Sequence, residues 1–274
     1  MSISLIMVTS VWHELAEMSL RKSVAAHSFD KVMLLCNKHL SVPVPHGYLQ
    51  IPDEFTRIDY SIFCMKGMVN VVDTDHVLIV QPDGMAINSQ YWTDEFLEYD
   101  YIGAPNNYGE AIVNSALVDV FGQEQCRGKF GWYVGNGGFS LRSKKLLNAL
   151  KDERITPSVL NEKDGQHYYG EDMQICVIHR QLLEQEYGIK FAPVELALQF
   201  STERACDNGM SFGFHGWQNI PWFLSEEECI YYIERIPPNW DQYRQNRLSG
   251  FLFEKRYYKA MQRLNHFREA WQSF

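Results

Sequence analysis

The stretch "ISLIMVTSVWHELAEMSLRKSVAAHSFDKVMLLC" at residues 3–36 decides the fold class of the chain. Residues 3–10 form a short apolar run rich in β-branched residues, and residues 31–36 form a second apolar run. Both runs predict buried strands. Residues 13–29 between them carry apolar side chains at roughly helical spacing. A strand, a helix and a second strand joined in this way form a βαβ unit, which implies a parallel sheet.

The next segments continue this pattern into a doubly wound α/β fold. Residues 43–52 are a proline-punctuated connection, residues 60–72 are predicted to be helical, and "HVLIV" at 76–80 is a third buried strand. Ligands of such folds bind at the carboxyl ends of the strands. Here two of those ends are Thr9-Ser10 and Gln81-Pro82-Asp83. A carboxylate there, followed by Gly84, can reach a divalent cation, or it is simply the polar end of a strand.

The rest of the chain is predicted to hold more helices on the outside of the α/β core. They cover residues 143–153, 170–188, 225–236 and 256–274. Residues 189–203 are predicted to be extended. We expect one domain over residues 1–221 and a C-terminal helical extension over residues 222–274 packed on it.

Three segments carry residues that suit chemistry, and each also has a plainer interpretation. In "VGNGGFSLRS" (134–143), Asn136, Gly137 and Gly138 allow close approach of a ligand, or form a tight turn into a strand. In "YYGEDMQIC" (168–176), Glu171 and Asp172 lie at the start of a helix. One of them acts as a general base, or both simply form the negative charge that stabilises a helix N-terminus. In "SFGFHGWQN" (211–219), His215 lies in a loop that suits metal binding, or has a structural role.

Composition narrows the class of protein. The net charge of −9 over 274 residues argues against a nucleic-acid partner. The six cysteines include no CxxC pair, no signal peptide is recognisable, and no apolar stretch approaches 18 residues, so we expect a cytoplasmic location. The aromatic and basic segment at 253–271 leaves open a peripheral contact with the inner membrane face, with an ordinary packed helix as the alternative.

The order of these segments resembles nucleotide-sugar-dependent glycosyltransferases of the GT-A fold. More narrowly, "YDYIGAPNN", "VGNGGFSLRS", "GEDMQIC" and "FGFHG" resemble a family known mainly as a domain of unknown function and placed among those transferases. The matching motifs span about residues 77–216. The resemblance implies a GT-A-like (Rossmann-like) α/β fold with a mixed, mainly parallel sheet flanked by helices.

The same resemblance implies a role for each candidate residue. Asp83 matches the second acid of the Asp-x-Asp motif and, with His215, would bind the Mn²⁺ or Mg²⁺ that bridges the donor diphosphate. Gln81 stands where the first acid is expected, and a neutral amide is a weaker cation ligand. The nucleotide sugar would contact Thr9, Ser10, Gln81, Asp83 and Gly84. The sugar or acceptor would contact Asn136, Gly137, Gly138 and Trp217.

Asp172, or else Glu171, matches the base that deprotonates the acceptor in inverting members. The expected enzyme therefore transfers a hexosyl-type sugar from a nucleotide sugar to a hydroxyl of a glycan or glycolipid, as in polysaccharide biosynthesis. One alternative is a nucleotidyltransferase, which would typically carry a glycine-rich, basic loop after the first strand, and residues 8–14 have none. The other is a non-catalytic, transferase-like carbohydrate-binding protein.

Overall fold

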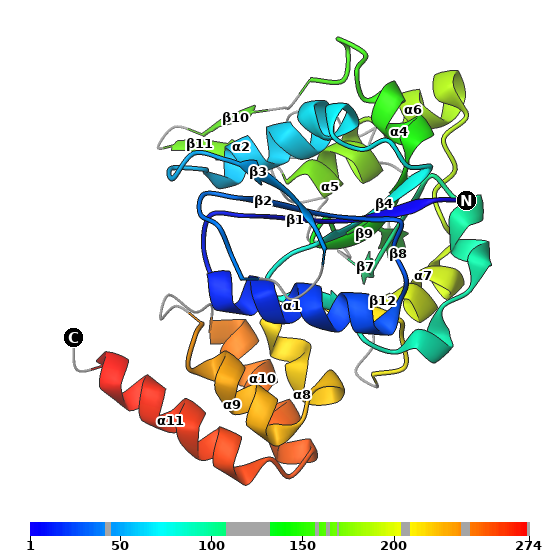
Figure 1. Cartoon of the computed structure of the whole chain (residues 1–274). Helices are drawn as coiled ribbons and strands as arrows, with labels where there is room; N and C mark the ends of the chain where they lie inside the picture. Colours follow the sequence, from blue (N-terminus) through cyan, green and yellow to red (C-terminus); the bar gives the residue numbers. More distant parts are fainter. Residues whose placement is uncertain are drawn as a thin grey trace.

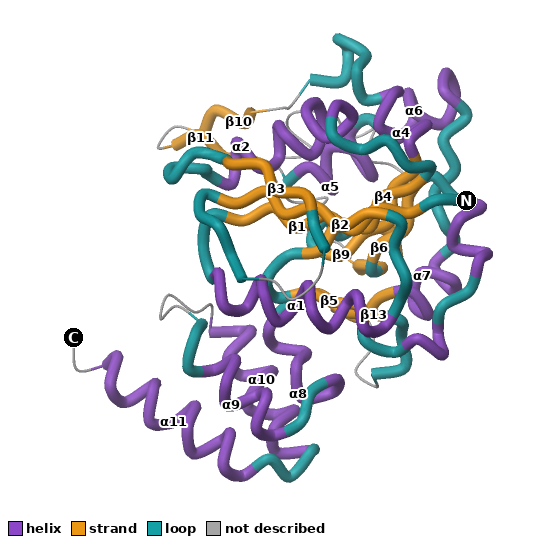
Figure 2. The backbone as a smooth tube through the Cα atoms, viewed as in Figure 1, coloured by secondary structure: helices purple, strands orange, loops and turns teal. Residues whose placement is uncertain are grey.

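The computed structural model describes residues 1–41, 45–107, 132–156, 159–162, 165–168, 170–203, 209–236 and 242–272. Its centre is a six-stranded sheet with helices on both faces (Figures 1 and 2). In spatial order the strands are β3 (Gly47–Gln50), β2 (Lys31–Cys36), β1 (Ile3–Thr9), β4 (His76–Val80), β9 (Phe139–Ser143) and β6 (Tyr101–Gly103).

Strand directions confirm the predicted mixed, mainly parallel α/β sheet. The strands β1 to β4 are parallel to one another, whereas β9 runs antiparallel to both β4 and β6. Alternation along β1 explains why this strand needs apolar residues throughout. Leu5 and Met7 belong to one hydrophobic cluster, while Ile6 and Val8 belong to another. Successive side chains of a strand point to opposite faces, so both faces of this sheet are buried.

Helix α1 (His13–Ala26) covers one face of the sheet, and further helices cover the other (Figure 1). Those on the second face are α2 (Arg57–Ile62), the π-helix Phe63–Gly67, the 3₁₀-helix Met68–Asn70, α4 (Lys144–Ala149), α5 (Glu171–Met173), the π-helix Gln174–Ile178 and α6 (Arg180–Tyr187). The predicted helix at 170–188 is therefore confirmed but contains a π-helical turn. Gly188 ends it with φ 58°, the left-handed conformation that favours glycine.

Two predicted boundaries are wrong. Residues 194–200 were expected to be extended, but they form helix α7 (Val194–Phe200), because Pro193 precedes it and Leu196, Ala197 and Phe200 bury one helical face. Residues 43–52 were expected to be a connection, but they include edge strand β3. Its side chains are half-buried or exposed, so the apolar pattern that marks an interior strand is weak there.

Smaller elements complete the description. Three short strands, β12 (Ser201–Thr202), β13 (Gly213–His215) and β5 (Gly84–Ala86), form a second sheet. Two antiparallel pairs join β7 (Pro105–Asn107) with β8 (Trp132–Val134), and β10 (Val159–Glu162) with β11 (Gly165–Tyr168). The other 3₁₀-helices among the described residues are Ser89–Tyr91, Asp94–Glu98 and Trp217–Asn219.

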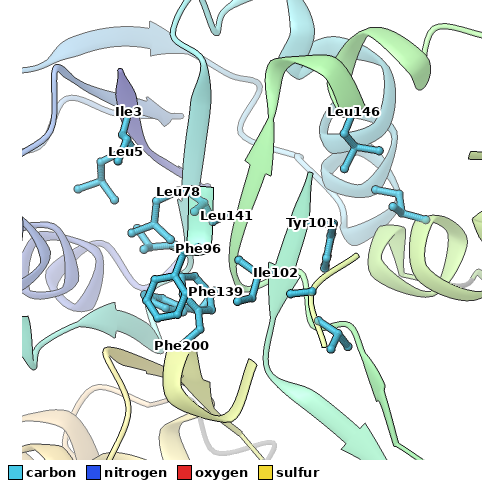
Figure 3. Packing of buried hydrophobic residues seen from close by; sticks show 14 of the residues in the cluster. Ile3, Leu5, Leu78, Phe96, Tyr101, Ile102, Phe139, Leu141, Leu146 and Phe200 are labelled. Carbon is cyan, nitrogen blue, oxygen red and sulfur yellow. The ribbon is translucent and has the colours of Figure 1, made fainter. Parts of the chain in front are cut away.

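Aromatic residues fill the main core beside the central sheet (Figure 3). The rings of Phe96 and Phe200 meet edge to face with centroids 5.2 Å apart, and Phe139 lies 5.1 Å from Phe200. Such pairs contribute about 0.5–1.5 kcal/mol beyond their burial. Part of the high aromatic content therefore serves packing.

The C-terminal helices lie together on the outer side of α1 (Figure 1). They are α8 (Ile220–Phe223), α9 (Glu226–Ile233), α10 (Gln242–Glu254) and α11 (Tyr258–Gln272). They share one hydrophobic cluster with Leu15 and Met18 of α1 and Met85 of β5. The predicted boundary between residues 221 and 222 falls inside α8. In the described ranges, no helix is both long enough and apolar enough to span a bilayer.

Candidate functional site

A cleft of about 240 Å³ opens at the carboxyl ends of β1 and β4. It is lined by Val8, Thr9, Ser10, Val11, Trp12, Phe55, Thr56, Arg57, Tyr60, Gln81, Pro82 and Asp83. Four of the five residues predicted to bind a nucleotide sugar, namely Thr9, Ser10, Gln81 and Asp83, therefore meet in one cleft. They do so because β1 and β4 are paired in parallel, with Met7 opposite Val80, so the two strands end side by side.

The backbone after β1 adopts an unusual conformation at the edge of this cleft. Trp12 has φ 53° and ψ 44°, in the left-handed region that a bulky residue rarely occupies. The Oγ1 of Thr9 donates to the carbonyl of Val11 at 2.5 Å, and the Oγ of Ser10 donates to the carbonyl of Phe55 at 3.2 Å. These bonds fix the wall of the cleft. Strained residues concentrate at functional sites, which agrees with a binding role for this turn.

The predicted glycine loop lies beside the turn that carries Asp83. Because β9 runs antiparallel to β4, the residues before β9 meet the residues after β4, and the N–H of Gln81 donates to the carbonyl of Gly138 at 2.9 Å. On the other side, Gly84 of β5 pairs with His215 of β13. The N–H of Gly216 also donates to the carbonyl of Asp83 at 2.8 Å. Segments far apart in the sequence thus converge on Asp83.

His215 is the centre of this cluster. Its Nε2 lies 3.0 Å from Oε1 of Gln81 and 3.4 Å from Oδ1 of Asp83, and its Nδ1 lies 3.3 Å from Oε1 of Glu203. Burial disfavours the imidazolium, but the carboxylates of Asp83 and Glu203 outweigh it and raise the pKa of His215 to about 10. The His215 charge in turn lowers the pKa of Asp83, although burial acts in the opposite direction. The three groups therefore form a charged, hydrogen-bonded unit.

The same cluster contains groups of the kinds that bind divalent cations, namely Nε2 of His215 and the side-chain oxygens of Gln81 and Asp83. Glu203 contacts the other ring nitrogen, as the outer carboxylate of many metal-bound histidines does. In the described ranges no group of three His, Cys, Asp or Glu residues could hold a metal ion. The available set is one carboxylate, one imidazole and one amide.

Asn136 positions both the loop and the histidine. It is buried with φ 68°, its Oδ1 accepts from the N–H of Gly138 at 2.9 Å and of Phe139 at 3.3 Å, and its Nδ2 lies 3.1 Å from Nδ1 of His215. Its side chain was predicted to contact sugar or acceptor, but all of these contacts are internal. Asparagine suits this position because it tolerates the left-handed conformation.

Gly137 and Gly138 leave room for the two halves of the site. A Cβ on Gly137 would lie 1.8 Å from Oε1 of Glu171, and a Cβ on Gly138 would lie 2.1 Å from Nε2 of His215. Glu171 and His215 therefore approach two consecutive residues of the loop. The loop "GNGG" joins the acidic helix start to the Asp83–His215 cluster.

We expect Gly138→Ala to displace His215 and to destabilise the fold by about 1–3 kcal/mol, as overpacking does. Urea unfolding followed by circular dichroism measures this change. The matched control is Gly250→Ala in α10, where a Cβ meets nothing within 4 Å and alanine should stabilise the helix by about 0.5–1 kcal/mol. Equal stability of Gly138→Ala and the wild type would contradict the described packing.

The two predicted acids have different surroundings. Glu171 is buried, and its Oε1 accepts from Nη2 of Arg142 at 3.0 Å, while Nε of this fully buried arginine donates to Oγ of Ser140 at 3.1 Å. Asp172 is half-buried, and burial together with the charge of Glu171 raises its pKa to about 6. Glu171 therefore neutralises Arg142. Asp172 is the acid whose pKa suits proton transfer near neutral pH.

Arg57 and Asp172 approach each other across Gly170. A Cβ on Gly170 would lie 2.6 Å from Oδ1 of Asp172 and 3.8 Å from Nη2 of Arg57. Arg57 itself lines the cleft. Asp172 is thereby placed next to the cleft wall, although it is not among the residues that line it.

Trp217 lies elsewhere. Only 4% of it is exposed, and it packs in the hydrophobic cluster of the C-terminal helices. The structure therefore does not bring it to the cleft with the other predicted residues. From the same cluster, the hydroxyl of Tyr232 in α9 donates to the carbonyl of Pro82. The C-terminal helices thus support the turn that carries Asp83.

Sequence reasoning missed Arg57, Glu203 and Arg142. Thr56 and Asp59 form a capping box that begins α2, and this signal could have placed Arg57 at a helix start near the strand ends. Arg142 is a charged residue within an otherwise uncharged strand, which marks a buried ion pair. Glu203 had no signal of its own, because the fold alone brings it to His215.

A family model described as "Protein of unknown function (DUF5672)" matches residues 56–215. The chain belongs to this family. The matched range contains the cleft residues from Thr56 onward, the glycine loop, the acidic helix start and His215. This confirms the expected membership of a family described as of unknown function. Thr9, Ser10 and the C-terminal helices lie outside the range of the DUF5672 model.

No curated protein matches the chain. Among solved structures, the chain is similar to one titled "Structure of the Bifunctional IspDF from Campylobacter jejuni". The two share 14% sequence identity with a TM-score of 0.33, over 56% of this chain and 44% of that chain. The chain thus spans less than half of that structure, and a likeness at this level carries no inference about activity.

Proposed function

We propose that this DUF5672 member is a GT-A-type glycosyltransferase that moves a sugar from a nucleotide sugar to a hydroxyl of a glycan or glycolipid. The observation that supports it is the convergence of the predicted residues. Thr9, Ser10, Gln81 and Asp83 line one cleft, and the glycine loop beside it separates His215 from the acidic helix start. Transfer of a sugar requires the donor site and the base to lie close together, and here they flank the same loop.

In the proposed reaction, the acceptor oxygen attacks the anomeric carbon while the bond from that carbon to the donor diphosphate breaks. The nucleoside diphosphate leaves with the electron pair, and the acceptor proton passes to the Asp172 carboxylate. Attack from the face opposite the leaving group inverts the anomeric centre. Glu171 forms an ion pair with Arg142 through its Oε1. Its charge raises the pKa of Asp172.

Asp83, His215 and Gln81 are the residues that would hold Mn²⁺ or Mg²⁺ in this site. Such an ion would neutralise charge on the leaving diphosphate. Glu203 and Asn136 would keep the His215 ring in place from its other nitrogen. Because Gln81 is neutral and Nε2 already has two oxygen partners, we expect weak metal binding that competes with a proton.

Calorimetric titration with a panel of nucleotide sugars, with and without Mn²⁺, tests the proposed function. We expect one nucleotide sugar to bind, and Asp83→Ala to weaken binding only when Mn²⁺ is present. Gln81→Glu, which restores an acid, should strengthen Mn²⁺ binding itself by about tenfold, since carboxylates are better ligands than amides. Absence of binding by every nucleotide sugar under both conditions would refute the proposal.

A further inference from the structure

The cleft contains a cation whose role the proposed reaction has not used. All residues that line the cleft belong to the described part of the chain, and Arg57 is the one arginine or lysine among them. Arg57 is exposed, and it takes part in none of the ion pairs found among the described residues. The chain as a whole has 34 acidic and 25 basic residues. Arg57 is therefore a positive group at the cleft in a chain whose acidic residues outnumber its basic residues.

The charges around the cleft favour an anionic ligand next to Arg57. On the Asp83 side, His215 pairs with the carboxylates of Asp83 and Glu203 and offsets part of their charge. On the opposite side, Arg142 compensates Glu171. Arg57 lines the cleft and belongs to neither of these pairs, so its positive charge is available to a ligand there. Its planar fork can donate two parallel hydrogen bonds to phosphate oxygens.

The position of Arg57 along the cleft also fits a diphosphate. It follows Phe55, whose carbonyl accepts a hydrogen bond from Ser10 at the end of β1, and it approaches Asp172 across Gly170. A leaving group between the nucleoside and the reacting carbon would occupy this interval. The neutral side chain of Gln81 leaves the metal position short of one acid, so a second source of positive charge has a function there.

We propose that Arg57 binds the diphosphate of a nucleoside diphosphate directly, so that the cleft holds this group without a divalent cation. The identity of the ligand as a sugar donor rests on the proposed function, but binding of a diphosphate does not. Inorganic pyrophosphate carries the diphosphate without base or sugar and is therefore the probe that separates the two.

The experiment is calorimetric titration of pyrophosphate into chelator-treated, full-length protein. We expect binding by the wild type, a loss of about tenfold or more in Arg57→Ala, and a smaller loss in Arg57→Lys, which keeps the charge but not the fork. The matched control is Arg21→Ala, another exposed arginine, which should bind as the wild type does. Circular dichroism of each variant checks that it is folded.

Three outcomes would overturn the inference. The first is binding that is equal in the wild type and Arg57→Ala, and the second is binding that needs Mn²⁺. The third is binding that is lost in Arg244→Ala instead, since Arg244 is close enough to lower the pKa of Asp83. If pyrophosphate binds through Arg57 while no nucleotide sugar binds or reacts, the proposed function fails and the anion site stands. If a nucleotide sugar is used as substrate while Arg57→Ala binds pyrophosphate as the wild type does, the anion site at Arg57 fails and the proposed function stands.

Discussion

Asp172→Asn is expected to lower the rate of glycosyl transfer by about 10²–10⁴-fold, the range that a positioned general base supplies. The amide cannot accept the acceptor proton, yet it keeps the shape of the carboxyl. Donor binding should therefore remain within about twofold of the wild type, because Asp172 is not among the residues that line the cleft. Steady-state kinetics gives the rate, and calorimetry gives the donor affinity. Full turnover in Asp172→Asn would exclude the base assignment.

The pH dependence checks the same residue. The pKa of Asp172 is raised to about 6, so kcat/KM of the wild type should fall below about pH 6 as the base is protonated. The folded state also binds this proton more tightly than the unfolded state. Stability should therefore fall as pH rises from about 4 to about 6 and change little above that. Asp172→Asn should lack this slope and be more stable near pH 7, by up to about 3 kcal/mol.

Glu171→Gln, one residue earlier, is expected to have the opposite effect on stability. It leaves the guanidinium of Arg142 buried without its carboxylate, and breaking a buried pair in this way costs about 3–5 kcal/mol. Both side chains are well buried, with 0% of Arg142 and 6% of Glu171 exposed. Urea unfolding at pH 7 measures the change in the free energy of unfolding.

A double variant supplies the control for this prediction. Glu171→Gln combined with Arg142→Met removes both charges, so much of the lost stability should return. A loss below about 1 kcal/mol in Glu171→Gln would mean that the pair does not hold the acidic helix start. In that case the distinction between the two acids, one for structure and one for proton transfer, would also fail.

Much of the fold follows from local sequence patterns. The apolar runs at 3–10, 31–36 and 76–80 predict buried strands, and the helix between the first two runs predicts that these two strands are parallel. Residues 189–203 show where local patterns fail. The segment alternates enough to suggest a strand, but packing of Leu196, Ala197 and Phe200 on one face selects a helix.

The candidate site was only partly predictable. The residues after β1 and β4 could be placed in one cleft, because parallel strands end together. The meeting of Gly138 with Gln81 could not, since it depends on β9 entering the sheet antiparallel to β4. Nor does the sequence distinguish Glu171 from Asp172. That difference depends on Arg142, which only the fold brings to Glu171.

The most direct test of glycosyl transfer is to identify the product released from the donor. Mass spectrometry follows each nucleotide sugar, and each nucleoside triphosphate, incubated with the full-length protein and a mixture of glycan and glycolipid acceptors. We expect the wild type to release a nucleoside diphosphate from one nucleotide sugar, and Asp172→Asn to release almost none. Release of pyrophosphate from a nucleoside triphosphate, with every nucleotide sugar left intact, would contradict glycosyl transfer and indicate a nucleotidyltransferase.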